Sequence, residues 1–331
     1  CLDHTFGGKI TSCLVNPRAC HETELVIAPT PRPKRIAVVG AGPAGLSFAV
    51  TAGERGHDVT LFEAAAQIGG QLDIARKVPG KEEFNETLRY YRRQIELTGV
   101  RLLLNTRASA ALLEDGDFDE IVVATGVVPR VPTIDGIDHP KVISYLDLLR
   151  DGRPVGSSVA IIGAGGIGFD VASYLTESGE SASLNPAKFC AQWGIDDGYG
   201  HRGGLREPRP EGALRQVMLL QRKSSRNRDR LGKTTGWIHR AALRSRGVLT
   251  LPAVSYRRID DEGLHVSIVG KDRLLVVDTI VVCAGQEPLR DLCDELKARG
   301  RSAHVIGGAD VAVELDAKRA IAQGTALAAA I

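Results

Sequence analysis

Two copies of one glycine-rich pattern constrain this chain more than any other feature of its sequence. The first copy, Gly40-Ala-Gly42-Pro-Ala44-Gly45, follows the apolar run 35–39. The second, Gly163-Ala-Gly165-Gly-Ile-Gly168, follows the apolar run 158–162. In both copies a stretch of helical composition comes next. The sequence therefore predicts an α/β protein in which one strand–turn–helix unit occurs twice.

The spacing of later segments indicates that the duplication extends beyond the glycines. The same 63 positions separate Glu63 from Gly126 in the first copy and Arg222 from Gly285 in the second. Upstream of Arg222 the second copy is longer by 36 positions. The extra length predicts an inserted segment over residues 176–214, which is rich in Gly, Pro and Arg.

Three glycines at this spacing suit a nucleotide diphosphate. The first permits a tight turn, the second lets a pyrophosphate approach the backbone, and the third lets helix and strand pack closely. The helix N-terminus then offers free N–H groups to the anion. The alternative is a pair of glycine turns in an unrelated α/β protein. We expect two Rossmann-like, three-layer dinucleotide-binding domains, the second inserted in the first.

The residue that follows the second strand of each copy distinguishes the two predicted sites. Glu63 can accept hydrogen bonds from both ribose hydroxyls of an adenosine. At the corresponding place, Arg222 and Lys223 would pair with a 2′-phosphate, which a carboxylate would repel. This favours NADPH at the second site. In the alternative, the pair only begins a solvated basic stretch. That stretch continues with Arg226, Arg228, Arg230 and Lys233.

The first site is predicted to bind FAD. Gln71 lies in a glycine-rich loop that could pass the flavin, and the turn with Gly308 and Asp310 leads into a helix predicted over residues 311–330. Asp310 would bond ribityl hydroxyls, and the helix N-terminus would favour negative charge on a reduced flavin. In the alternatives, Asp310 is a plain helix N-cap and Gln71 is a solvated loop residue.

Charge and hydropathy exclude several classes. The formal net charge of +2 gives no bulk attraction to nucleic acid or to an anionic membrane. No apolar run approaches the roughly 18–20 residues that a membrane helix needs, and no signal pattern occurs at the start. We expect a cytoplasmic protein with neither a nucleic-acid nor a membrane partner. A thioredoxin-reductase-like disulfide exchange is disfavoured because the sequence contains no C-x-x-C.

Longer segments carry a resemblance to a known family. The glycine motifs, together with Ala124-Thr-Gly126, Cys283-Ala-Gly285 and the turn 307–310, resemble those of pyridine-nucleotide disulfide-reductase-like flavoproteins. More closely, the chain resembles the C-terminal half of the bacterial NADPH-dependent 2,4-dienoyl-CoA reductases, iron–sulfur flavoproteins related to old yellow enzyme. The segments that carry this closer resemblance are 11–23, 79–84, 231–240, 285–288 and 319–324.

The resemblance implies the electron-input half of an enzyme of fatty-acid β-oxidation. NADPH would reduce FAD, and electrons would pass through a 4Fe-4S cluster to FMN in an N-terminal barrel, where dienoyl-CoA would be reduced. Cys1 and Cys13 match the last two cluster ligands. The barrel is expected to precede Cys1, so no substrate-reducing catalytic residue is predicted within this chain.

Two other classes stay open: an electron-input subunit similar to the small subunit of glutamate synthase, and a non-catalytic nucleotide-binding module. The predicted domains are the same in every case. Residues 1–33 would form an iron–sulfur arm remnant and linker, residues 34–140 with 286–331 the FAD-binding domain, and residues 155–285 the NADPH-binding domain.

Overall fold

Two similar parallel sheets organise the chain. The computed structural model describes residues 2–224, 232, 234–312 and 316–331. Unit 1 comprises Cys1–Arg76, Glu83–Val128 and Gln286–Ile331, and unit 2 comprises Lys77–Glu82 and Pro129–Gly285. Each unit contains one five-stranded sheet in which all neighbouring strands run parallel. The predicted α/β fold class is confirmed.

The sheet of unit 1 has the strand order β15-β4-β1-β2-β3. Its strands are β1 (Arg35–Val39), β2 (Asp58–Phe62), β3 (Arg101–Leu103), β4 (Glu120–Val123) and β15 (His304–Val305). In β1, Ile36 and Val38 face one hydrophobic core, and Ala37 and Val39 face another. Because both faces are covered, β1 is a continuous apolar run rather than an alternating one.

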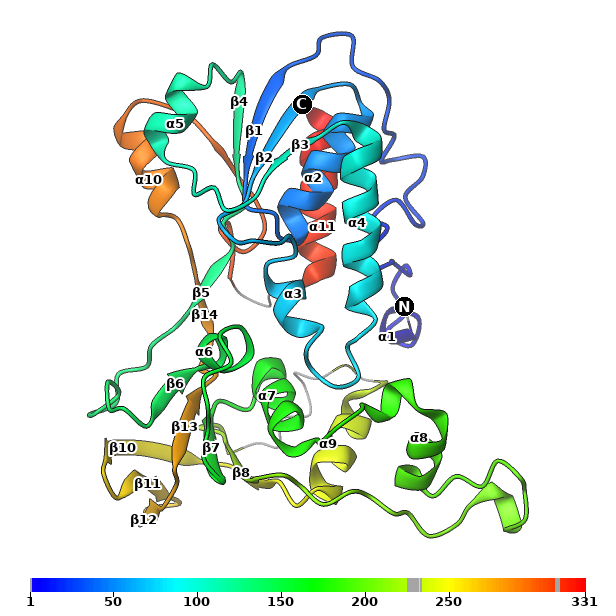
Figure 1. The fold of residues 1–331 in the computed structure, drawn as a ribbon, viewed down its shortest axis with the longest axis vertical. Helices are drawn as coiled ribbons and strands as arrows, with labels where there is room; N and C mark the ends of the chain where they lie inside the picture. Colours follow the sequence, from blue (N-terminus) through cyan, green and yellow to red (C-terminus); the bar gives the residue numbers. More distant parts are fainter. Residues whose placement is uncertain (1, 225–231, 233, 313–315) are drawn as a thin grey trace. The chain divides into compact units, whose positions relative to one another are not determined.

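Helices cover both faces of this sheet (Figure 1). On one face lie α2 (Pro43–Glu54), α4 (Phe84–Thr98) and α11 (Ala317–Ala330). On the other lie α5 (Ala110–Asp115) and α10 (Asp291–Ala298). Unit 1 also contains α1 (Leu2–Thr5) and α3 (Gln71–Ala75). None of the helices in the described part of the chain is both long enough and apolar enough to span a bilayer.

The sheet of unit 2 repeats this arrangement with the order β6-β13-β7-β8-β9. Its strands are β6 (Val142–Ser144), β7 (Ser158–Ile162), β8 (Gln216–Leu220), β9 (Leu249–Leu251) and β13 (Thr279–Val282). The helices α6 (Tyr145–Leu149), α7 (Gly166–Thr176) and α9 (Gly236–Ser245) accompany it. β7 and β8 therefore correspond to β1 and β2, as the duplication predicts.

An antiparallel sheet completes unit 2. It consists of β10 (Val254–Asp260), β11 (Gly263–Ile268) and β12 (Lys271–Leu275). Val254, Leu264 and Val266 share a core with Ala160 and Ile162 of β7. The antiparallel sheet thus covers the face of the parallel sheet to which these β7 side chains point.

Residues 129–140 belong to unit 2 rather than to the domain in which we expected them. Ile134 is part of the core beneath the antiparallel sheet, and Asp135 accepts a hydrogen bond from the Ile259 amide at 2.8 Å. After residue 128 the chain leaves unit 1 within β5 (Val127–Pro129), and it returns at the start of β14 (Gln286–Pro288), the strand that pairs with β5. The sequence boundary was placed too late because residues 129–140 have no glycine signature of their own.

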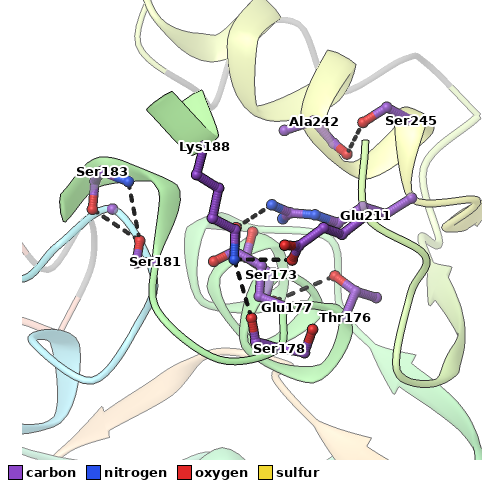
Figure 2. A network of polar contacts seen from close by, with 12 residues as sticks. Ser173, Thr176, Glu177, Ser178, Ser181, Ser183, Lys188, Glu211, Ala242 and Ser245 are labelled. Carbon is purple, nitrogen blue, oxygen red and sulfur yellow. Dashed lines mark hydrogen bonds and ion pairs between the residues drawn. The ribbon is translucent and has the colours of Figure 1, made fainter. Parts of the chain in front are cut away.

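The predicted insertion is present between α7 and β8. It contains η1 (Ala182–Leu184), α8 (Pro186–Trp193) and η2 (Arg202–Gly204). Figure 2 shows Lys188 of α8 reaching the Ser178 carbonyl at 3.3 Å and the Glu211 carboxylate at 2.9 Å. These contacts join the two ends of the insertion, which explains how β8 resumes beside β7 after so long an excursion.

The last helix packs closely on α2. A Cβ atom on Gly324 of α11 would lie 2.3 Å from the Ala44 carbonyl oxygen, and the buried Ser47 hydroxyl donates to the Ile321 carbonyl at 3.0 Å. The two helices can approach this closely because Gly324 has no side chain.

We expect Gly324→Ala to destabilise the protein by about 1–3 kcal/mol, the usual cost of overpacking a well-filled core. The added methyl group would push against backbone, and this outweighs the higher helix propensity of alanine. Urea denaturation followed by circular dichroism would measure the change. Gly212→Ala is the matched control, because a Cβ atom there meets nothing within 4 Å. Equal stability of Gly324→Ala and the wild type would contradict this close packing.

Candidate dinucleotide-binding sites

In the first glycine turn, two glycines are packed against backbone and one is not. Gly40 has a φ of 105°, and a Cβ atom there would lie 2.4 Å from the Ala124 carbonyl oxygen. A Cβ atom on Gly45 would lie 1.9 Å from the Gly40 carbonyl oxygen. On Gly42 it would meet nothing within 4 Å. The space beside Gly42 is therefore free for a ligand.

The second glycine turn has the same geometry. Gly163 has a φ of 114°, and its Cβ atom would lie 2.3 Å from the Cys283 carbonyl oxygen. A Cβ atom on Gly168 would lie 2.0 Å from the Gly163 carbonyl oxygen, and one on Gly165 would meet nothing within 4 Å. The agreement at all three positions shows that the duplicated motif builds the same turn twice.

Both turns lead into helices with uncapped N-termini. Gly42 is the N-cap of α2 and Gly165 is the N-cap of α7, and neither end has a side-chain cap. The first N–H groups of a helix have no partner within the helix and carry a partial positive charge. Open space beside such an end fits the pyrophosphate of a dinucleotide.

Glu63 is joined to the first turn. Its Oε2 accepts a hydrogen bond from the Ala41 amide and its Oε1 one from the Ala65 amide, both at 2.8 Å. These bonds fix the carboxylate at the end of β2 next to the glycines. A carboxylate held there can accept the hydroxyls of a ribose.

The structure corrects the expected partner of Glu63 in unit 2. The carbonyl of Phe62 in β2 accepts a hydrogen bond from the Gly40 amide. The carbonyl of Leu220 in β8 accepts one from the Gly163 amide in the same way. The residue after each strand is therefore Glu63 in unit 1 and Gln221 in unit 2, so the alignment of Glu63 with Arg222 was wrong by one position. The second copy has one more residue between this point and the end of β13.

Arg222 and Lys223 follow Gln221 directly and are exposed, whereas Gln221 is buried. Burial raises the pKa of Tyr256 to about 12, and the positive charge of Arg222 acts on the same hydroxyl in the opposite direction. Arg222, which follows the end of β8, thus acts electrostatically on a residue of β10. The rest of the predicted basic stretch, Arg226, Arg228, Arg230 and Lys233, lies outside the described residues.

The loop before Gln71 meets the first glycine turn. The Gly69 amide donates to the Ala41 carbonyl at 2.8 Å, and a Cβ atom on Gly70 would lie 3.1 Å from the Gly42 Cα. Gln71 is the first residue of α3 and is partly exposed. The structure therefore brings this predicted site residue close to the turn that it was expected to serve.

The turn with Gly308 and Asp310 also reaches the first site. A Cβ atom on Gly307 would lie 2.8 Å from the Ala44 Cβ in the first turn of α2. The predicted helix over residues 311–330 begins later, at Ala317, and its N-cap is Asp316. The N-cap alternative for Asp310 was therefore wrong, and so was the prediction that the helix starts directly after it.

Gly126 is linked to the turn that carries Asp310. It has a φ of 79°, and its carbonyl accepts a hydrogen bond from the Leu289 amide at 3.0 Å. Arg290, the next residue, donates through Nε to the Ala309 carbonyl at 2.7 Å. The segments that carry Gly126 and Asp310 are thus linked through two consecutive residues.

The structure does not bring the two predicted cluster ligands, Cys1 and Cys13, together in a described site. Cys1 lies outside the described residues, and Cys13 is a partly exposed free thiol. Within the described ranges, one group of three possible ligands lies close together, Asp260, Glu262 and His265. Arg258 contacts the Asp260 carboxylate at 3.2 Å, which disfavours a cation at that group. The Cys1–Cys13 pair stays a prediction.

Sequence reasoning missed two polar residues near these turns. Gln221 directly follows the apolar run that ends at Leu220, as Glu63 follows Phe62, and this local signal places it opposite Glu63. Gln323, on α11, donates to the Asp310 carboxylate at 2.8 Å. Its position carries no local signal, because the contact depends on how α11 packs.

Comparisons with known proteins agree with this geometry. The profile of the family described as "Pyridine nucleotide-disulphide oxidoreductase" matches residues 34–307. A metal reductase of Desulforamulus reducens is 32% identical over 313 residues, covering 93% of this chain and 46% of its own. A cinnamate reductase of Clostridium sporogenes is 34% identical over 185 residues, covering 56% of this chain and 27% of its own.

Among solved structures, a 2-naphthoyl-CoA reductase in complex with 2-naphthoyl-CoA is similar over the whole chain. Its TM-score is 0.84 at 28% sequence identity, with 100% of this chain and 45% of that chain covered. This chain thus spans less than half the length of these relatives.

We expect Gly42→Ala and Gly165→Ala to leave stability nearly unchanged and to weaken nucleotide binding at the altered turn by tenfold or more. A methyl group fits the free space in each turn but would take the place of the pyrophosphate. Equilibrium titration with FAD and with NADPH would separate the two turns, and urea denaturation would report stability. Unchanged affinity for both nucleotides in both variants would contradict the assignment of these turns as binding sites.

Proposed function

Because the chain belongs to the pyridine nucleotide-disulphide oxidoreductase family, we propose that it performs the electron-input reaction of a flavoenzyme, in which NADPH bound by unit 2 reduces FAD bound by unit 1. One observation carries the proposal. In both units the middle glycine of the motif alone faces open space, at the uncapped start of a helix. Two such turns in one chain suit a donor and an acceptor that are both dinucleotides.

The FAD assignment of unit 1 rests on its acidic groups. Glu63 is held by two backbone amides and can accept the adenosine ribose hydroxyls. Asp310, Gly308, Gly126 and Gln71 are the residues that we propose for the ribityl and flavin end. FAD supplies the hydride-accepting ring, and the protein supplies position and charge.

The NADPH assignment of unit 2 rests on the loss of that acidic group. Gln221 has no charge to repel a 2′-phosphate, and Arg222 and Lys223 next to it are exposed cations that can pair with one. The pyrophosphate would bind at the turn formed by Gly163, Gly165 and Gly168. The shift of the alignment by one position thus strengthens the preference for NADPH, because a neutral residue replaces Glu63.

We propose further that the whole protein is a 2,4-dienoyl-CoA reductase. The segments named in the sequence analysis support this, and the similarity to a 2-naphthoyl-CoA reductase adds a relative that by its name reduces a CoA thioester. In this proposal the FMN barrel, the 4Fe-4S cluster with Cys1 and Cys13 among its ligands, and the dienoyl-CoA site belong to a longer polypeptide.

The first experiment is the visible spectrum of the purified chain, followed by anaerobic addition of NADPH or, separately, NADH. We expect a flavin spectrum that is bleached at least tenfold faster by NADPH. Equal rates with both nucleotides would contradict the 2′-phosphate assignment. A colourless protein that does not take up FAD, but binds adenine nucleotides, would favour the non-catalytic module instead.

Gln221→Glu and Arg222→Gln should each weaken NADPH binding by roughly tenfold, the effect of about 1.4 kcal/mol, with little effect on NADH. The first introduces a carboxylate near the 2′-phosphate and the second removes a cation. The ratio of kcat/KM for NADPH to that for NADH would measure the change. Arg244→Gln, at another exposed arginine of unit 2, is the control. A ratio unchanged in both variants would contradict this placement of the 2′-phosphate.

A further inference from the structure

Gln323 joins the two ends of the turn that carries Asp310. Its Oε1 accepts a hydrogen bond from the Gly307 amide at 2.8 Å, and its Nε2 donates to Asp310 Oδ2 at 2.8 Å. An amide side chain can do both at once because it has an acceptor and a donor on one carbon. A carboxylate at this place could accept from the Gly307 amide but could not donate to Asp310.

Two arginines hold the backbone of the same turn. Arg290 donates through Nε to the Ala309 carbonyl at 2.7 Å and through Nη2 to the Asp310 carbonyl. Arg319, on α11, donates through Nη2 to the Val311 carbonyl. These bonds fix the main chain, whereas the bond from Gln323 fixes the Asp310 side chain. The two functions are therefore separable by mutation.

The turn lies against the start of α2. Gly307 meets the Ala44 side chain, and Gly324, next to Gln323, meets the Ala44 carbonyl. Ala44 is in the first turn of α2, where the pyrophosphate is expected. Gln323 thus ties Asp310 to α11, which packs on the helix that would bind the cofactor, although more than 270 positions separate Gln323 from Ala44.

We propose that Gln323 is a positioning residue for FAD. It holds Oδ2 of Asp310, so that the partly exposed carboxylate keeps one orientation and presents Oδ1 to a cofactor hydroxyl. Without the amide, the Asp310 side chain could change its χ1 rotamer and its carboxylate could turn about the broad χ2 torsion, and FAD binding would have to restrict both. The inference rests on the proposed function, since it takes FAD as the ligand of unit 1.

A double-mutant cycle with Asp310→Ala tests the proposal. FAD is removed from the full chain, and its dissociation constant is measured by titration with flavin fluorescence. We expect Gln323→Leu to raise this constant about tenfold. Gln323→Glu should raise it further, since the new side chain still accepts from the Gly307 amide but places a second negative charge beside Asp310. In the Asp310→Ala background, both substitutions should change the constant less than twofold.

Gln94→Leu, at a partly buried glutamine of α4, is the matched control and should bind FAD like the wild type. Urea denaturation of every variant identifies a general loss of structure. The proposal is overturned if Gln323→Leu binds FAD like the wild type, or if its effect persists undiminished without Asp310. A wild-type chain that does not bind FAD would overturn the proposed function as well, so the two failures can be told apart.

Discussion

At the first and third glycine of each motif, a backbone carbonyl oxygen occupies the place that a Cβ atom would take. The Ala124 carbonyl lies beside Gly40 and the Cys283 carbonyl beside Gly163, and each of these glycines in turn lies beside the third glycine of its motif. This contact sets how closely the first helix approaches the sheet. It also aims the free N–H groups of that helix at the open space next to the middle glycine, and the other parts of each site gather around that point.

The fold and the central part of each site could be predicted because their causes are local. A continuous apolar run indicates a strand buried on both faces, and three glycines at fixed spacing build the turn wherever they follow such a run. The duplication was visible for the same reason, since Gly163, Gly165 and Gly168 meet the same steric requirements as Gly40, Gly42 and Gly45. The insertion before β8 could be predicted because the segment between the helix α7 and the strand β8 is longer than its counterpart in the first copy.

The features that were predicted wrongly or not at all depend on strand register and on helix packing. The spacing to Gly285 matches Arg222 with Glu63, whereas the hydrogen bonds from Gly40 to Phe62 and from Gly163 to Leu220 match Gln221 with Glu63. Residue composition predicts that the final helix begins at residue 311, but Asp316 is its N-cap and the helix begins at Ala317. The contact of Gln323 with Asp310 could not be predicted, since a glutamine in a helix is ordinarily exposed to solvent. Only the close contact of α11 with α2 brings it to Asp310.

The contact between α2 and α11 also bears on how cofactor binding and folding are connected. Ala44 lies between Gly307 and Gly324, so the first site requires that α2 and α11, which are far apart in the sequence, be assembled first. A ligand that binds only this assembled form stabilises it by RT ln(1 + [L]/Kd), about 2.7 kcal/mol at a hundredfold excess over Kd. Unit 2 builds its glycine turn within the continuous segment 129–285, without a helix from so distant a part of the sequence. Dinucleotide binding should therefore be coupled to the assembly of α2 with α11 in unit 1, whereas the turn in unit 2 has no such requirement.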